Sequence, residues 1–178
     1  MSNTCPFKRD KKFQGKVLGL SVYEGVVEDR RIRREIIEHP GAAAILAIDD
    51  KKGIVMVNQY RFPHGSVLEI PAGTLERGED PIECARRELQ EETGYAAKSI
   101  KPLLSFYPSI GYNTEIIHCF VATGLTPTKN NLDEDEILSV ETYTLGDILS
   151  MIYNGKIKDS KTICSVLAYN STGALHIN

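Results

Sequence analysis

The feature that most constrains this chain is the stretch of residues 73–95, GTLERGEDPIECARRELQEETGY, which predicts a loop followed by a short helix. Asp80 is a good N-cap, Pro81 suits the first helical position, and Glu83 completes a capping box. Gly94 supplies a natural C-terminal stop. We therefore expect a helix between Asp80 and Gly94, fed by a loop of fixed length.

This helix is expected to carry an acidic stripe beside an apolar face. At 100° per residue the apolar face should pack on a sheet, and it comprises Ile82, Ala85 and Leu89. Glu88, Glu91 and Glu92 share a second stripe, where each like-charged pair costs roughly 0.2–0.5 kcal/mol. Arg86 and Arg87 offset part of that repulsion. A hard cation that prefers oxygen ligands, Mg²⁺ or Mn²⁺, would neutralise the rest.

An isolated R-E-x-x-E-E segment is more often a solvated helix face than a metal site, but here the wider spacing is specific. Gly73 is followed after five residues by Glu79, and after seven more by R-E-L-Q-E-E-T-G-Y, from Arg87 to Tyr95. This spacing resembles the Nudix box, G-x5-E-x7-R-E-U-x-E-E-x-G-U, in which U is a bulky aliphatic residue. Every fixed letter matches, and the only departure is the aromatic Tyr95. The chain is therefore similar to Nudix hydrolases.

The resemblance implies an α/β fold: the Nudix α/β/α sandwich, with a mixed sheet and helices on both faces, plus a small N-terminal antiparallel β-sheet. It divides the chain into residues 1–40, a hairpin or dimerisation sheet, and residues 41–178, the hydrolase domain. In the enzymes that it resembles, the small sheet exchanges between subunits. A two-fold homodimer is the corresponding expectation.

The resemblance also assigns roles to residues of the box. The metal ion, Mg²⁺ with Mn²⁺ as a substitute, is expected to be held by Glu88, Glu91, Glu92 and the carbonyl oxygen of Ala72. Glu92 is also expected to be catalytic. The residues expected to be structural are Gly73, Glu79, Arg87 and Gly94, with an ion pair between Glu79 and Arg87 that locks the loop to the helix.

The implied reaction is hydrolysis of the pyrophosphate bond of a nucleoside diphosphate linked to a second group. A pyrophosphate bridge is anionic and repels hydroxide, so divalent ions that neutralise its oxygens favour attack by water. For ADP-ribose, the products would be AMP and ribose 5-phosphate.

Segments outside the box resemble ADP-ribose pyrophosphatases in particular. They are Q-Y-R ending at Arg61, L-E-I-P-A-G containing Glu69, and Y-P-S-x-G containing Pro108, the residue that marks this subgroup. We expect Pro108 at the substrate site. Arg61 either binds a phosphate in bidentate fashion or is a surface arginine. Glu69 is either a buried partner or a group behind the metal.

A second acidic run, residues 133–136, directly precedes a predicted strand. Such a run is commonly a solvated loop. In the resembling enzymes, however, a loop here supplies an acid that contacts a metal or activates the water. Glu134 and Glu136 are the candidate catalytic bases, and Glu91 or Glu115 is the alternative.

The composition of the chain argues against nucleic-acid binding, membrane spanning and a disulfide framework. Of the 178 residues, 25% are charged and 42% apolar, as in an ordinary globular protein. The net charge of −3 indicates no broad basic surface for nucleic acid, and no apolar run is long enough to cross a membrane. No apolar segment follows the basic N-terminal patch, so no signal peptide is expected. The four cysteines form no C-x-x-C pair, which favours reduced thiols in a cytoplasmic protein.

The remaining pattern predicts further strands and helices. Residues 1–12 are expected to be a frayed terminus, with residues 13–23 and 31–38 paired as a hairpin across a turn at residues 25–30. The further expected strands are 42–48, 54–60, 67–70, 96–104, 116–122 and 137–143. A polar loop is expected at residues 124–131. The expected helices are 145–154 and a final one that opens at 158 and runs to about 169.

Two other functions remain open. The chain could act on another sugar nucleotide or on a dinucleotide, or it could be a non-catalytic sensor that binds ADP-ribose and regulates a partner. A sensor is expected to lack the acids of the box, whereas Glu88, Glu91 and Glu92 are all present. Tryptophan is absent, so stacking on adenine must use Tyr, Phe or Arg.

Overall fold

The structure is a computed structural model that describes residues 7–49, 53–128 and 138–171. The chain forms two compact units: Met1–Gly41 with Tyr107–Ile116, and Ala42–Phe106 with Ile117–Asn178. The loop after residue 106 belongs to the first unit because the Ile37 N–H donates to the Tyr112 carbonyl at 2.7 Å. Ten residues from the middle of the chain, Tyr107–Ile116, are therefore part of the N-terminal unit.

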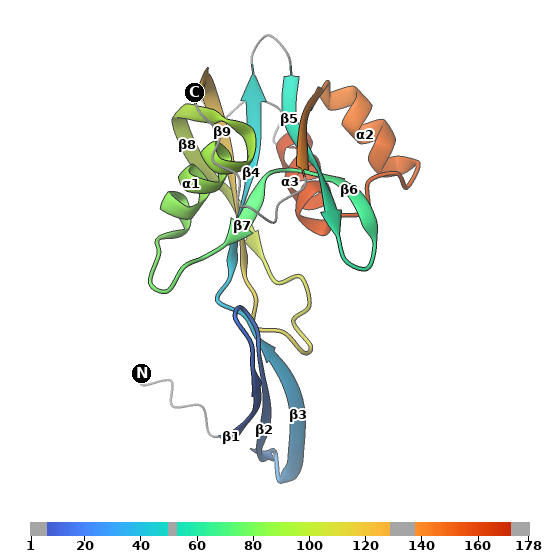
Figure 1. The fold of residues 1–178 in the computed structure, drawn as a ribbon. Coiled ribbons are helices and arrows are strands. Elements are labelled where there is room, and N and C mark those ends of the chain that lie inside the picture. Colours follow the sequence, from blue (N-terminus) through green and yellow to red (C-terminus); the bar gives the residue numbers. More distant parts are fainter. Residues whose placement is uncertain (1–6, 50–52, 129–137, 172–178) are drawn as a thin grey trace. The chain divides into compact units, whose positions relative to one another are not determined.

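The first unit is a three-stranded antiparallel sheet in the order β1-β2-β3, drawn in blue in Figure 1. Its strands are β1 (Lys8–Gln14), β2 (Gly19–Val27) and β3 (Arg30–Glu38). The predicted small antiparallel sheet is confirmed, and its predicted hairpin is present as the pair β2 and β3. The predicted fraying is wrong for residues 8–12, which lie in a third strand, β1, while residues 1–6 lie outside the described residues. The sequence of β1, KRDKKFQ, shows no alternation of apolar and polar residues that would mark it as a strand. Such alternation is not needed there, because every residue of β1 is exposed. A turn closed by the Gly15 N–H and the Leu18 carbonyl at 2.8 Å separates β1 from β2.

The turn between β2 and β3 is also shorter than predicted. Glu28 and Asp29 form it alone, with φ of 48° and 62°. Two consecutive residues at positive φ are the geometry of a two-residue hairpin turn that matches the twist of its strands. The ladder therefore extends from Gly19 opposite Glu38 to the turn itself.

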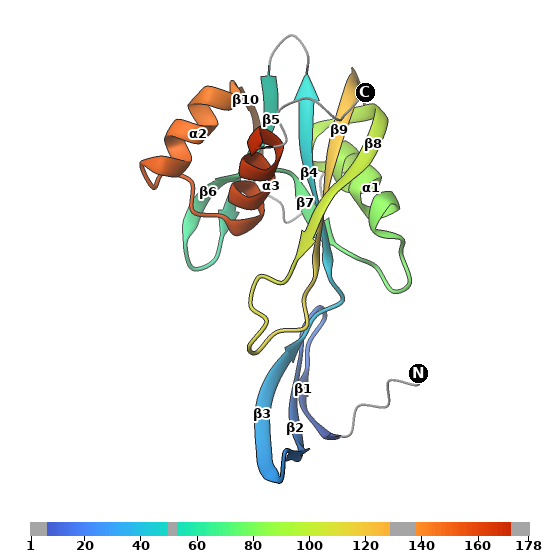
Figure 2. The same cartoon turned by 180° about the vertical axis from the view of Figure 1, so that it is seen from behind.

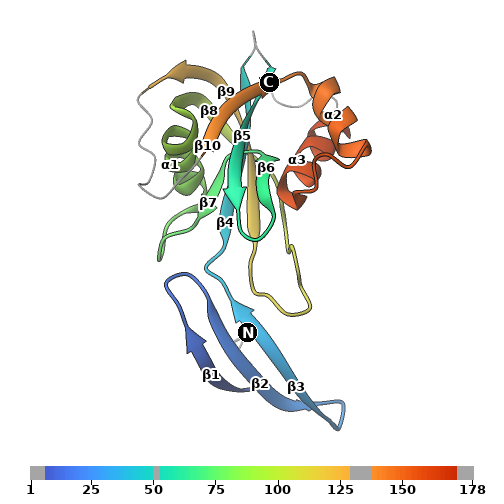
Figure 3. The same ribbon diagram turned by 45° about the vertical axis from the view of Figure 1, so that its right-hand side comes forward.

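The second unit is built on a mixed seven-stranded sheet: five strands follow the order β10-β5-β4-β9-β8, β6 pairs with β5, and β7 pairs with β4. The strands are β4 (Ala42–Asp49), β5 (Gly53–Arg61), β6 (Gly65–Glu69), β7 (Ala72–Thr74), β8 (Tyr95–Phe106), β9 (Ile117–Pro127) and β10 (Leu138–Tyr143). Only β4 and β9 pair in parallel among the described strands. β10 and β6 lie on opposite sides of β5 (Figure 3).

Helices cover both faces of this sheet: α1 (Pro81–Thr93) lies on one, and α2 (Leu145–Tyr153) and α3 (Ser160–Ser171) lie on the other (Figures 1 and 2). Side chains of β4 alternate between two apolar cores. Ala44 and Leu46 pack with α2 and α3, whereas Ala43 and Ile45 pack with α1. A strand buried on both faces reads as a continuous apolar run. This arrangement confirms the predicted α/β/α sandwich with a mixed sheet.

Most element predictions in this unit are confirmed, with longer strands than expected. β9 continues to Pro127, so the loop predicted from residue 124 begins later, after Gly124 has entered the strand with a φ of 67°. α2 begins at the predicted residue, 145, and is capped by Thr144, whose side chain accepts a hydrogen bond from the Asp147 N–H at 3.2 Å. None of the described helices is long and apolar enough to span a membrane.

Candidate active site

Local sequence fixes both ends of α1, the helix that carries the acidic stripe. Asp80 Oδ1 accepts a hydrogen bond from the Ile82 N–H at 3.0 Å, and Gly94 ends the helix with a φ of 68°. Both predicted caps are confirmed. Glu83 forms an ion pair with Arg86 at 3.4 Å instead of the expected bond back to the cap. The box therefore gives a helix with a fixed start and a fixed stop.

Glu92 places a carboxylate in the interior beside β7. The residue is 2% exposed, and its Oε2 accepts a hydrogen bond from the Ala72 N–H at 3.0 Å. A buried carboxylate needs such donors to stay ionised. The bond brings Glu92 against the peptide of Ala72, the residue whose carbonyl was predicted as a metal ligand.

Glu88 lies one turn earlier and is 8% exposed. It occupies the space that a side chain at residue 73 would need. A Cβ built on Gly73 would lie 1.8 Å from Glu88 Oε1, far inside van der Waals contact. The glycine of the box is therefore required by the close approach of the Glu88 carboxylate to the β7 backbone.

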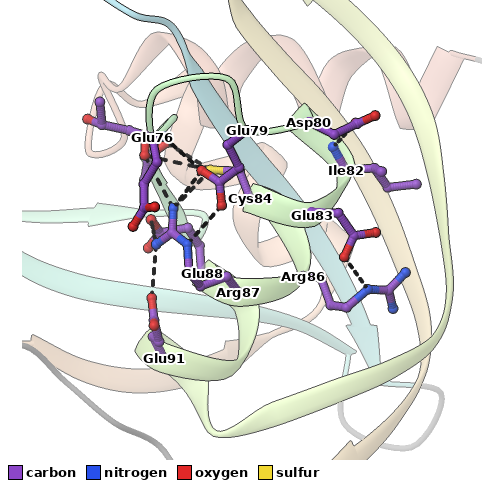
Figure 4. Close-up of polar contacts among 12 residues, drawn as sticks. Glu76, Glu79, Asp80, Ile82, Glu83, Cys84, Arg86, Arg87, Glu88 and Glu91 are labelled. Carbon is purple, nitrogen blue, oxygen red and sulfur yellow. Dashed lines mark hydrogen bonds and ion pairs between the residues drawn. The ribbon is translucent and has the colours of Figure 1, made fainter.

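Arg87 is the centre of the ion pairs that hold the loop on the helix (Figure 4). Its Nε and Nη2 each donate to the carboxylate of Glu79 at 3.0 Å, which is the ion pair predicted from the sequence. Its Nη1 donates to Glu88 at 2.6 Å and to Glu91 at 3.0 Å. One guanidinium thus joins the loop acid to two acids of the helix stripe.

These contacts set the charge states around the helix. Hydrogen bonds from Arg87 hold the pKa of the Glu79 carboxyl below its ordinary value, and the same pair raises the pKa of Arg87. Burial raises the pKa of the Cys84 thiol to about 12, so Cys84 is a neutral thiol at physiological pH. The loop and helix therefore present an ionised Glu79 carboxylate beside a neutral Cys84 thiol.

The donor set fits a hard divalent cation in kind, because Glu88, Glu91, Glu92 and the Ala72 carbonyl offer oxygen atoms only. Among the residues that the structure describes, no three His, Cys, Asp or Glu side chains are gathered into a ready metal cluster. Arg87 contacts Glu88 and Glu91 in this arrangement. Binding of an ion would therefore compete with the Arg87 contacts.

Arg61 lies at the end of β5 and binds Glu69, with Nε and Nη2 both 2.8 Å from Glu69 Oε1. Glu69 is 2% exposed, so it is a buried partner, one of the two roles left open by the sequence. Its other oxygen accepts from Lys161 at the start of α3. Lys161 was missed because it lies 92 residues away in sequence and no local pattern joins the two.

The other predicted site residues lie either in the first unit or outside the described residues. Pro108 lies half-buried in the loop that belongs to the first unit. Glu115 lies in the same loop, and its Oε2 accepts from the Asn113 side chain at 3.2 Å. The two candidate bases, Glu134 and Glu136, lie outside the described residues.

Comparison with known proteins shows which family and which individual proteins the chain is similar to. Residues 38–165 match the NUDIX domain. The chain is 45% identical over 163 residues to a methanol dehydrogenase activator of Bacillus methanolicus, covering 89% of this chain and 88% of that protein. It is 42% identical over 162 residues to an ADP-ribose pyrophosphatase of Bacillus subtilis (strain 168), with 89% and 88% covered.

A solved structure of an ADP compounds hydrolase matches the fold with a TM-score of 0.80 and 19% identity, covering 93% of this chain and 91% of that one. The box residues around α1, the α/β/α sandwich and the matched span of residues 38–165 all agree. The chain belongs to the Nudix hydrolase family.

Proposed function

We propose that the chain hydrolyses the pyrophosphate bond of a nucleoside diphosphate linked to a second group, with ADP-ribose as its preferred substrate. The products would be AMP and ribose 5-phosphate. The observation that carries the proposal is the buried carboxylate of Glu92 docked on the Ala72 peptide within a complete Nudix box. The 42% identity to a Bacillus subtilis ADP-ribose pyrophosphatase supports the substrate.

Named residues of the chain would bind the metal ion, bind a phosphate and act as the general base. Glu88 and Glu92, with Glu91 beside them, would hold Mg²⁺, or Mn²⁺ in its place. The ion, when bound, would neutralise the anionic phosphate oxygens. Arg61, with a side chain 42% exposed, would bind a phosphate through its guanidinium. Glu134 or Glu136 would take the proton from the attacking water.

Product analysis tests this proposal. The purified protein is incubated with Mg²⁺ and, separately, ADP-ribose, GDP-mannose, diadenosine polyphosphates and dNTPs, and the products are separated by ion-exchange chromatography. We expect equimolar AMP and ribose 5-phosphate from ADP-ribose. Turnover of the dNTPs alone would contradict the proposal.

A regulatory role is the second candidate, because the chain is 45% identical to a methanol dehydrogenase activator. This role is compatible with hydrolysis and resembles the sensor that the sequence left open. The wild-type protein and the Glu92→Gln variant are added separately to a purified alcohol dehydrogenase, and the dehydrogenase activity is measured. This distinguishes regulation by binding alone from regulation that needs hydrolysis. Activation by both proteins would indicate binding alone, whereas activation by wild type only would indicate that hydrolysis is needed.

We also propose that the chain is a cytoplasmic homodimer joined through its N-terminal sheet. Apolar side chains remain exposed on this unit, at 61% for Phe13, 59% for Val26 and 43% for both Val17 and Leu18. Exposed apolar side chains gathered on a small sheet favour a protein partner. The cysteines among the described residues, Cys84, Cys119 and Cys164, are free thiols, which is in keeping with a reducing compartment.

A further inference from the structure

A network of charged groups joins the start of α3 to β5 and β6, and the chemistry proposed above uses only one of its members, Arg61. Glu69 is at its centre, with a side chain only 3% exposed. Its Oε1 accepts from Arg61, and its Oε2 accepts from Lys161. A buried carboxylate is stable only when its charge is compensated, and here two cations share that task.

Lys161 is itself shared between two acids. Its Nζ also donates to Asp159 Oδ1 at 2.9 Å. The other Asp159 oxygen caps α3, accepting from the N–H and the hydroxyl of Thr162 at 2.9 and 2.6 Å. Asp159 therefore competes with Glu69 for the charge of Lys161.

The same turn of α3 holds the segment that leads into β7. Thr162 is fully buried, and its Oγ1 accepts from the Ile70 N–H at 2.9 Å. The next carbonyl, that of Pro71, accepts from the Ile45 N–H at 2.9 Å. The first turn of α3 is thus fixed to the backbone directly before Ala72, so the ammonium of Lys161 has a defined place.

We propose that Lys161 is a positioning residue that sets how strongly Arg61 binds the phosphates of the substrate; this inference rests on the proposed function. Because Lys161 takes one oxygen of Glu69, Arg61 does not neutralise that carboxylate alone and keeps a net attraction for an anion. Arg61 is the cation that reaches a ligand, since its side chain is 42% exposed and that of Lys161 only 12%. Among the described residues, Arg61 Nη1 has no hydrogen-bond partner, which leaves it as a donor for phosphate.

Three single variants test the proposal by steady-state kinetics on ADP-ribose. Lys161→Met leaves Glu69 to Arg61 alone and is expected to raise KM about tenfold, with kcat within about threefold of wild type. Lys158→Met removes the same charge from a nearby exposed position and is expected to leave KM unchanged. Asp159→Asn keeps a good helix cap but gives Lys161 wholly to Glu69, so KM is expected to fall about twofold. General destabilisation of the protein would not raise KM in one of these two neighbouring variants and lower it in the other.

A double-mutant cycle and a binding measurement complete the test. In an Arg61→Gln background, Lys161→Met is expected to add no further rise in KM, because the lysine acts through the arginine. The Kd for inorganic pyrophosphate, measured by calorimetry with Mg²⁺ present, is expected to change as KM does. If Lys161→Met does not fold, Asp159→Asn alone decides the outcome.

Equal KM values for the Lys161→Met and Lys158→Met variants, or a higher KM in Asp159→Asn, would overturn the inference. The calorimetric result separates this failure from failure of the proposed function. A wild-type protein that binds pyrophosphate in a Lys161-dependent manner, yet releases no AMP from ADP-ribose, would contradict the function and support the inference.

Discussion

At the scale of single residues, the site is defined by how closely carboxylates approach backbone. Glu92 meets the Ala72 N–H, and Glu88 fills the space above Gly73. The sequence predicted these residues because the box has fixed spacing along one helix face. It could not predict the contact between Glu69 and Lys161, since only the packing of α3 brings them together.

The Glu92→Gln variant tests the role of this carboxylate. The change keeps the size of the side chain and removes its charge, so we expect kcat to fall at least a hundredfold, about 2.7 kcal/mol in the barrier, with the fold retained. Glu83→Gln is the matched control, because that carboxylate is exposed on the same helix and pairs only with Arg86 among the described residues. Kinetics at saturating Mg²⁺ and thermal melting give both readouts. Near wild-type turnover in Glu92→Gln would remove the residue from the site.

The catalytic base is tested by Glu134→Gln and Glu136→Gln. We expect one of the two variants, but not both alike, to lose most of its kcat with little change in substrate affinity, because a base acts in the transition state. The measurement is steady-state kinetics together with calorimetric binding of ADP-ribose. Full activity in both variants would move the base elsewhere, to Glu91 or Glu115.

At the scale of elements, α1 shows what local sequence can specify. Asp80 and Gly94 were predicted because capping follows from residue type and spacing, whereas the Glu79–Arg87 pair was predicted from the family resemblance. β1 was not predicted, since all of its side chains are exposed and its partner β2 is found only by folding. Strand ends were also missed where pairing extends a strand past its apolar residues, as at the end of β9.

The lock between loop and helix predicts a pH dependence. Arg87 lowers the pKa of Glu79 in the folded state, so the pair stabilises the fold above the ordinary pKa of a glutamate, about 4.3, and that stabilisation is lost as pH falls through the lowered value. The free energy of unfolding should therefore differ most between wild type and Glu79→Gln at neutral pH, and the difference should shrink in acid. Urea unfolding from pH 7 to pH 3 measures it, with Glu83→Gln as control. A difference that does not change with pH would contradict the lock.

At the scale of the whole molecule, the small N-terminal sheet is the part whose stability is least explained by contacts within the chain. Its strands expose apolar side chains such as Phe13 and Val26, and a sheet of this size gains little stability from its own packing. These apolar residues call for an apolar partner, and the family resemblance favours a second chain as that partner.

Light scattering of the intact protein tests the dimer. Each chain has a mass of 19.8 kDa, so we expect about twice that mass at micromolar concentration. Deleting residues 1–38 should give a poorly soluble monomer that binds ADP-ribose more weakly, although every acid of the box remains. An intact protein that is monomeric and fully active would rule out a homodimer joined through the N-terminal sheet.

The most direct test of the central claim is the ratio of kcat/KM for ADP-ribose to that for GDP-mannose, measured with purified wild-type protein and Mg²⁺. The account predicts AMP as a product and a ratio of at least about tenfold in favour of ADP-ribose, the discrimination that a few well-placed contacts supply. The Glu92→Gln variant, assayed in parallel, should lose at least a hundredfold in kcat on ADP-ribose and on GDP-mannose. A ratio below one, or no release of AMP by the wild type, would contradict the account.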